Sequence, residues 1–233
     1  MDELGTILGV WAHPDDEAYL SSLLMASARG AGGRVVVATA THGELGTADP
    51  DTWPPKRLAE LRRYELTASL AALGVGEHDH HWLGFADGEC DNLPAAGTEA
   101  VAQLLAEVQP DTIVTFGPDG MTGHADHRAV SAWTTAAWRC AGRPGRLLYS
   151  TVPPSFHAEW GPVNNHVGLW QYGPGPMTDD AAIALRVRGD EAMLDRKLVA
   201  LRAHASQVSG LLAELGEETF RRWWSTEYFT EIR

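Results

Sequence analysis

The stretch TILGVWAHPDDE, residues 6–17, decides the fold that this sequence predicts. Residues 6–12 are short, apolar and partly β-branched, which is typical of a strand buried on both faces. From Glu17 to Arg29 the leucines recur at helical spacing, and Gly30 follows as a stop signal. A buried strand that leads directly into a helix is the start of a βαβ unit, from which parallel sheets are built.

The same alternation of apolar runs and helical patterns continues along the chain. It predicts the α/β class, with a Rossmann-like, mostly parallel sheet and helices on both faces. Ligands of such sheets bind at the carboxyl ends of the strands, so we expect a site in the loops that begin there. Further strands are expected at 34–41, 81–83, 111–116, 146–152 and 182–187, and further helices at 56–73, 98–108, 126–140, 191–205 and 217–224.

Residues 153–180 differ from the rest because Pro and Gly recur there among Trp and Tyr residues. The segment is too aromatic for a flexible linker, so we expect a long functional loop or lid. The length of 233 residues favours one domain over 1–233. Within it we expect a Rossmann-like core over 1–150, followed over 151–233 by the lid-like loop and C-terminal helices.

The charge balance argues against two classes of partner. Lys and Arg number 18 and Asp and Glu number 31, which gives a net charge of −13. Nucleic acids and anionic membrane surfaces both require a basic face, so neither is expected as a partner. Apolar runs are too short to span a bilayer, Met1–Gly5 lacks the positive start of a signal peptide, and Cys90 and Cys140 are too few for a disulfide scaffold. We expect a soluble, cytoplasmic protein, for which a homo-oligomer is possible.

An imidazole and three carboxylates crowd the loop after the first strand, residues 13–17. So much negative charge at a strand end is unfavourable unless a cation lies among the carboxylates. His13 and Asp16 could both reach one metal ion, which would leave Asp15 free as a base. The alternative is that Asp15 and Asp16 only cap the following helix. A glycine-rich phosphate cradle is missing, so a dinucleotide site is not expected here.

The loop after the strand at 111–116 contains His124 and His127, three residues apart at a helix start. One of them could complete a His/Asp/His set with an open position, as in catalytic zinc sites. The other could donate a hydrogen bond to a developing oxyanion. Ordinary helix-start residues are the alternative, but two such loops at one edge of the sheet favour a metal site. Asp126 could orient either histidine or cap its helix.

The motifs HPDDE (13–17) and GHADH (123–127) resemble those of the LmbE-like, or PIG-L, family of zinc-dependent N-deacetylases. Members of this family remove acetyl groups from N-acetylglucosaminyl conjugates. Thr122 departs from the pattern, because some relatives have a tyrosine there that is thought to help polarise the carbonyl. The resemblance extends over residues 6–207, with further matching segments at 41–46 (THGELG), 62–65 (RRYE), 73–75 (LGV), 83–88 (LGFADG) and 197–207.

The resemblance implies that His13, Asp16 and His127 bind Zn²⁺, in place of which Fe²⁺ is possible. It makes Asp15 the general base and His124 the residue that stabilises the oxyanion. Zinc would lower the pKa of a bound water from ~15.7 toward ~7, and Asp15 would take the remaining proton.

The resemblance also suggests contacts outside this central group. Arg62 and Asp87 resemble residues that contact the sugar or its appendage. His204 lies in the matching C-terminal segment, where a place in the site wall and helix packing are equally expected. Tyr172 could stack on a sugar or anchor its own loop.

The sequence therefore predicts a metal-dependent hydrolase that removes an N-acetyl or other acyl group from a small amino-sugar conjugate. One alternative is an amidase that cleaves a larger acyl group, with residues 153–180 setting the difference. The other is a metal-binding or sugar-binding module without turnover. The presence of Asp15 and His124 together argues against a mere binder, which needs no spare base.

Overall fold

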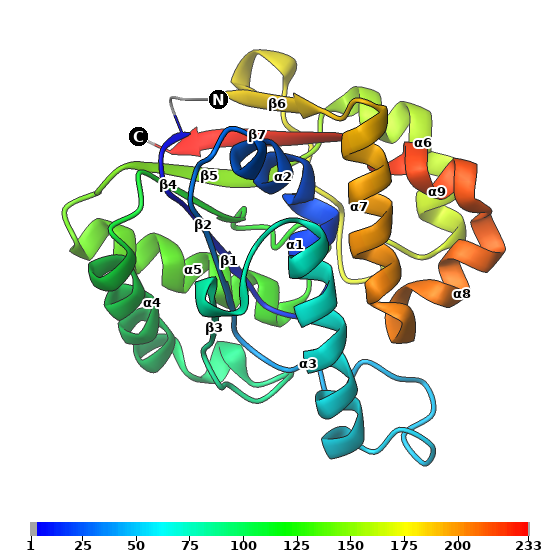
Figure 1. Ribbon diagram of the computed structural model, residues 1–233, viewed down its shortest axis with the longest axis horizontal. Helices are drawn as coiled ribbons and strands as arrows, with labels where there is room; N and C mark the ends of the chain where they lie inside the picture. Colours follow the sequence, from blue (N-terminus) through cyan, green and yellow to red (C-terminus); the bar gives the residue numbers. More distant parts are fainter. Residues whose placement is uncertain (1–3, 233) are drawn as a thin grey trace.

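A seven-stranded mixed sheet forms the centre of the protein, whose computed structural model describes residues 4–232 (Figure 1). The strand order is β3-β2-β1-β4-β5-β7-β6. The first five of these strands run parallel, and only β7 is antiparallel to its neighbours β5 and β6. The predicted α/β fold with a mostly parallel sheet is confirmed. The strands are Ile7–Trp11 (β1), Val35–Thr39 (β2), His80–Trp82 (β3), Thr112–Phe116 (β4), Arg146–Thr151 (β5), Leu185–Arg188 (β6) and Thr226–Ile232 (β7).

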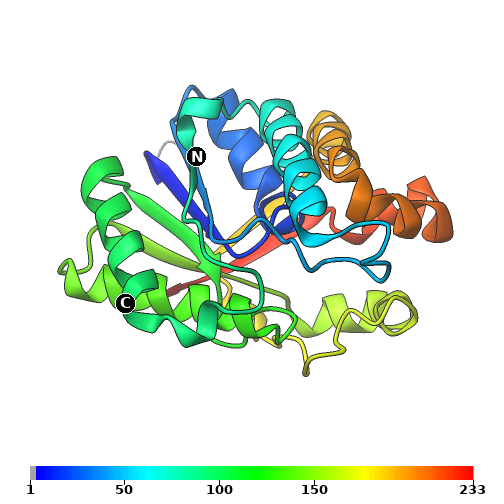
Figure 2. The ribbon, with the colours of Figure 1, turned by 90° about the horizontal axis from the view of Figure 1, so that it is seen from below.

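Helices cover both faces of the sheet, as Figures 1 and 2 show from two directions. Helices α4 and α5 pack together on one face, and α2, α3 and α7 lie on the other. Every residue of β1, β2 and β4 is buried, as expected for strands that are covered on both faces. The helices are Asp16–Leu20 (α1), Ser22–Gly30 (α2), Pro55–Ala72 (α3), Pro94–Val108 (α4), Ala125–Cys140 (α5), Pro154–His166 (α6), Glu191–Ala203 (α7), Ala205–Leu215 (α8) and Glu217–Trp223 (α9), with short 3₁₀ turns at Glu77–Asp79, Cys90–Asn92 and Asp180–Ala182.

The single helix predicted from Glu17 to Arg29 is in fact two, because the backbone breaks at Ser21. The hydroxyl groups of Ser21 and Ser22 donate to the carbonyl oxygens of the preceding turn. Such bonds compete with the regular helix and bend it. The break lets α1 continue the loop that follows β1, while α2 packs along the sheet.

The C-terminal third contains more regular structure than we expected. Most of the first half of the segment 153–180 is helix α6, which begins with Pro154 at a position where proline fits without loss of a hydrogen bond. The expected helix at 191–205 ends at Ala203, and a further helix, α8, follows it. Strand β7 was not predicted at all. The division into a core over 1–150 and a lid-like remainder stays a prediction, since the sheet takes strands from both parts.

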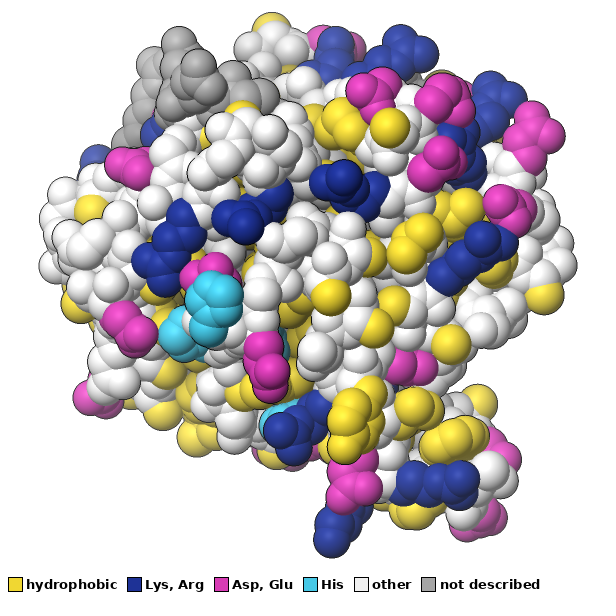
Figure 3. Space-filling model, in the orientation of Figure 1, with side chains coloured by type: hydrophobic (Ala, Val, Ile, Leu, Met, Phe, Trp, Pro, Cys, Tyr) yellow, Lys and Arg dark blue, Asp and Glu magenta, His cyan; other side chains and the backbone are white. Residues whose placement is uncertain are grey.

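The surface carries charges of both signs. On the face in Figure 3, acidic and basic side chains are interspersed. Among residues 4–232 no helix combines the length and the apolar character that crossing a bilayer requires. The first three residues of the Met1–Gly5 stretch, on which the signal-peptide argument rests, lie outside the described residues.

A buried ion pair joins the end of the chain to its beginning. The ammonium group of Lys197 lies 2.8 Å from Oε1 of Glu227, and both side chains are almost fully buried. The same carboxylate accepts the backbone N–H groups of Leu23 and Leu24 at the start of α2, and Lys197 also donates to the carbonyl of Tyr19. Burial lowers the pKa of Lys197, and the charge of Glu227 opposes this shift. One group of charges thus holds together the helices α1, α2 and α7 and the strand β7.

We predict that Glu227→Gln destabilises the protein by about 3–5 kcal/mol, because it leaves the buried ammonium of Lys197 without a counter-charge. Urea unfolding measures the loss. The matched control is Asp180→Asn, which removes an exposed ion pair with Arg186 and should change stability by no more than about 1 kcal/mol. Equal, small effects of both substitutions would contradict this account.

Candidate metal centre and active site

Two loops at the carboxyl end of the sheet bring three of the predicted residues together. His13 and Asp16 follow β1, and His127 lies in the first turn of α5. His13 Nδ1 is 3.1 Å from His127 Nε2, while Asp16 Oδ2 is 3.7 Å from His13 Nδ1 and Asp16 Oδ1 is 3.4 Å from His127 Nε2. Ligand atoms of a tetrahedral zinc ion, each about 2.0–2.1 Å from the metal, are roughly 3.3 Å apart. The donor set therefore fits a small divalent ion.

The other hydrogen bonds of His13 and His127 leave one ring nitrogen of each histidine directed at the cluster. His127 Nδ1 lies 2.9 Å from the carbonyl oxygen of Gly120, so it must carry the proton and leave the lone pair on Nε2. His13 Nε2 faces carboxylates only, which leaves Nδ1 directed at the cluster. Asp16 Oδ2 accepts the backbone N–H of His13 at 2.8 Å, which fixes its carboxylate. Outer contacts of this kind orient ligands in known metal sites.

Asp126 and Asp87 form the carboxylate support behind His13. Their oxygens lie 3.2 and 3.1 Å from His13 Nε2, and these three residues form a second compact group of donors. Asp126 also accepts the backbone N–H groups of Gly88 and Cys90. We expected its side chain to orient His124 or His127 or to cap α5; it does none of these, because its oxygens are used by His13 and by the loop after β3.

His124 lies beside the cluster, with its ring centroid 4.9 Å from that of His13. It belongs to a compact donor group with His13 and His127. Its Nδ1 accepts the backbone N–H of Asp126, however, so in the neutral ring the proton sits on Nε2. Burial and the charge of His13 lower the pKa of His124. A neutral ring with a protonated Nε2 is a hydrogen-bond donor rather than a metal ligand.

The pKa values of the three metal-ligand candidates are shifted in different directions. Burial disfavours a charged His13, but the hydrogen bonds that its ring donates to Asp126 and Asp87, together with the charge of Asp16, outweigh this and raise its pKa to about 10. Burial raises the pKa of Asp16 to about 7, although the charge of His13 opposes the shift. Burial together with the charges of His13 and His124 lowers the pKa of His127 well below its usual range. A proton on His13 thus occupies the place that a cation would take.

Asp15 lies next to the cluster in a strained backbone conformation, with φ at 113°. Strain of this kind persists only where the surroundings enforce it. Arg62 donates to Asp15 Oδ2 at 3.2 Å and also to the carbonyl oxygens of Pro14 and Gly43. A Cβ at Gly43, whose φ is +63°, would lie 2.2 Å from the Arg62 guanidinium, so any other residue here would displace Arg62. Asp15, which we expected to remain free as a base, is thus held by an ion pair with Arg62.

Glu17 is the residue that sequence reasoning missed. It is completely buried, and its Oε2 accepts the backbone N–H of Asp15 while Oε1 contacts the Ser69 hydroxyl and His204 Nε2, both at 2.8 Å. Burial would raise the pKa of Glu17, but the charge and hydrogen bond of His204 lower it; the Glu17 charge likewise raises the pKa of His204 against burial. His204 is fully buried, so it contributes packing and an ion pair and not an exposed wall.

A polar cavity of about 420 Å³, here called the polar chamber, opens beside the cluster. Its lining includes Asp15, Asp16 and the three histidines together with Arg62, Asp87 and Gly46. Substrate contacts by Arg62 and Asp87 stay a prediction, because both side chains are already bonded to the protein. Tyr172, from the expected lid, lines the same cavity with its ring perpendicular to that of His124. The expected lid therefore supplies a phenol near Thr122, the position at which some relatives have a tyrosine and this chain does not.

A family model described as PIG-L, GlcNAc-PI de-N-acetylase, matches residues 8–138, more than half of the chain. The chain belongs to the PIG-L family. A protein of Kineococcus radiotolerans named 1D-myo-inositol 2-acetamido-2-deoxy-alpha-D-glucopyranoside deacetylase is 32% identical over 262 residues, which cover 90% of this chain and 70% of that protein. A protein of the same name from Thermobifida fusca is 29% identical, covering 96% and 91%.

Solved structures agree on the fold of this PIG-L member. The N,N'-diacetylchitobiose deacetylase from Pyrococcus horikoshii aligns with a TM-score of 0.72 at 22% identity, over 99% of this chain and 85% of that one. The resemblance to the PIG-L family that the motifs indicated is confirmed.

We predict that zinc binding to the metal-free PIG-L protein strengthens as the pH rises. His13 holds its proton up to a pKa of about 10, and the proton must leave before Nδ1 can bind a metal. Loss of one proton gives roughly a tenfold gain in apparent affinity per pH unit between pH 7 and 9. Below about pH 7 the gain should be steeper, since Asp16 then carries a proton too. Competition with a chelating dye measures it, and an affinity independent of pH would contradict the assignment.

We also predict that Asp126→Asn weakens zinc binding about 10- to 100-fold, because the amide no longer supports His13 as a charged acceptor. The same chelator titration gives the affinity. Asp91→Asn is the matched control, since Asp91 is an exposed aspartate in the neighbouring 3₁₀ turn. If both variants bind zinc equally well, Asp126 has no role in the metal centre.

Proposed function

We propose that this protein is a zinc-dependent hydrolase that removes an N-acyl group from an N-acetylglucosamine-type conjugate. The observation that carries the proposal is that three candidate metal ligands, His13, Asp16 and His127, lie together in one cavity. Asp15 and His124, which are suited to take part in amide hydrolysis, line the same cavity. The names of the relatives, which are deacetylases of an acetamido sugar linked to inositol, support this choice.

Asp15 is suited to the part of general base. A bound zinc ion would supply Lewis acidity, which makes water a nucleophile near neutral pH and polarises the amide carbonyl. Burial raises the pKa of Asp15, whereas the charges of Arg62 and His204 hold it down. A raised pKa makes the Asp15 carboxylate a stronger acceptor for a proton from water. Arg62 and Glu17 fix the side chain and the backbone, so the base is positioned before substrate binds.

His124 is suited to stabilise the negative charge that develops on the carbonyl oxygen. Its Nε2 carries a proton in the neutral ring, and neither Asp126 nor any other acceptor is bonded to that atom among the contacts of the described residues. A preorganised donor of this kind contributes to acyl transfer because it meets charge only in the transition state. The leaving amine takes its proton from Asp15 or from His124.

The substrate is a small amino-sugar conjugate in this proposal. The polar chamber offers Arg62 and Asp87 for sugar hydroxyls. Both cysteines, Cys90 and Cys140, are free thiols, which fits a reducing compartment such as the cytoplasm.

We predict that Asp15→Asn lowers the rate of amine release about 10²- to 10⁴-fold, because the amide cannot accept the proton. Zinc should stay bound, since Asp15 is not one of the three ligands. The measurement is release of free amine from N-acetylglucosaminides, with metal content determined on the same sample.

Asp51→Asn, in the exposed loop before α3, serves as the control and should retain full activity. An Asp15→Asn enzyme with full activity would remove Asp15 from the mechanism. A wild-type protein that holds zinc but releases no amine from any N-acyl glucosaminide would instead favour a binding module.

A further inference from the structure

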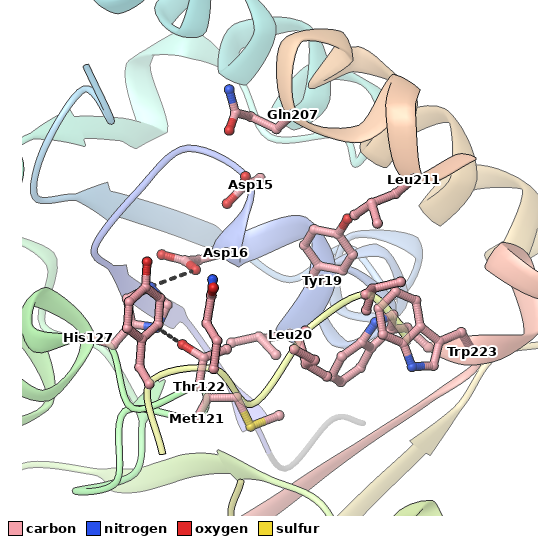
Figure 4. A pocket seen from close by; sticks show the side chains of 16 residues that line it. Asp15, Asp16, Tyr19, Leu20, Met121, Thr122, His127, Gln207, Leu211 and Trp223 are labelled. Atoms are coloured by element: carbon pink, nitrogen blue, oxygen red, sulfur yellow. Dashed lines mark hydrogen bonds and ion pairs between the residues drawn. The ribbon is translucent and has the colours of Figure 1, made fainter. Parts of the chain in front are cut away.

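A second cavity, of about 280 Å³, adjoins the polar chamber and differs from it in character. It lies between α1, residues 167–172 and the helices α8 and α9, and we call it the apolar chamber. Figure 4 shows Asp16 and His127 at one end and Leu211 and Trp223 at the other. Its walls away from the metal ligands are mostly hydrophobic or aromatic: Tyr19, Leu20, Leu169, Leu211, Trp223 and Trp224.

The two chambers meet at the groups that would perform the chemistry. The residues that line both are Asp15, Asp16, His127, Tyr172 and Gln207. An amide held between the base and the metal ligands therefore has one chamber on either side. Its two substituents, the acyl chain and the sugar, then extend into different chambers.

We infer that the apolar chamber binds the acyl chain of the substrate and that the preferred chain is aliphatic and longer than acetyl. This inference rests on the proposed function, which places the amide where the chambers meet. Sugar hydroxyl groups require hydrogen-bond partners, and these are found in the polar chamber, at Arg62, Asp87 and His124. The wall of Leu20, Leu211 and the tryptophans offers few, so the sugar belongs on the polar side.

The size of the apolar chamber exceeds what acetyl needs. A methyl group takes about the space of one water molecule, ~30 Å³, so acetyl would leave most of the 280 Å³ to water against hydrophobic walls. A chain of roughly six to eight carbons fits that volume. Each methylene that leaves water for this chamber should improve binding up to about fourfold.

The aglycone has a different route out of the site. A further groove, lined by Trp53, Leu58 and Leu61, shares Gly46 and Gln207 with the polar chamber. A group attached to the sugar can extend along this groove, away from the apolar chamber. The acyl chain is then the one part of the substrate that is left to fill the apolar chamber.

The test is a series of methyl glucosaminides that differ only in the N-acyl group: acetyl, butanoyl, hexanoyl and octanoyl. Zinc-loaded wild-type protein should show kcat/KM rising about three- to fourfold per methylene up to hexanoyl. A second series keeps acetyl and lengthens the alkyl aglycone from methyl to octyl, and here kcat/KM should change little through the apolar chamber.

Leu211→Trp fills the apolar chamber and should lower the ratio of kcat/KM for hexanoyl over acetyl at least tenfold. Val199→Trp is the matched control, because Val199 is 55% exposed on α7 and lines neither chamber; its ratio should equal that of the wild type.

The outcomes separate this inference from the proposed function. Cleavage of acetyl with slower cleavage of every longer chain overturns the acyl assignment and leaves the proposed function standing. Rates that rise with the aglycone and not with the acyl chain assign the chamber to the aglycone, which also overturns the inference. If the zinc-loaded protein cleaves no amide of either series, the proposed function itself fails.

Discussion

The arrangement of the site depends on one imidazole, that of His13, which is held between carboxylates on one side and the other candidate metal ligands on the opposite side. Its Nε2 contacts Asp126 and Asp87, and its Nδ1 contacts His127 and Asp16. These partners come from the loop after β1, the loop after β3 and the start of α5, so one side chain connects three segments far apart in sequence. A parallel sheet makes this possible, because all its strands deliver their following loops to the same edge.

A second layer of buried charges connects Asp15 to the C-terminal helices. Glu17 accepts the Asp15 backbone N–H and pairs with His204 at the junction of α7 and α8, and Arg62 from α3 reaches the Asp15 carboxylate directly. Buried ion pairs give little net stability, since desolvation offsets their attraction. They do fix the geometry of the residues that they contact. Here that residue is Asp15, which is held in a strained backbone conformation.

Features of the fold and the site could be predicted where neighbouring residues in the sequence determine them. The strand–loop–helix order and the residues 13–17 and 123–127 follow from short-range patterns, and the structure brings them to one place. Strand β7 was missed because Glu227, an inward-facing carboxylate, interrupts its apolar alternation, and its partner Lys197 lies thirty residues away. The contacts of Asp126 and the role of Glu17 were also beyond reach, because each depends on which distant loop lies opposite, which no spacing along the chain reveals.

Part of the excess of acidic residues in the sequence is concentrated at this site. Asp16, Asp87 and Asp126 would repel one another if all were charged in a buried site, and a proton on His13 relieves that repulsion. A divalent ion bound to His13 Nδ1 would do the same with greater charge and would leave Nε2–H on its carboxylates. In this proposal, proton and metal would compete for one position, and the hydrogen bonds from Nε2 to Asp126 and Asp87 would be kept. The loops that carry Asp15 and His124 would then not need to rearrange when a metal binds.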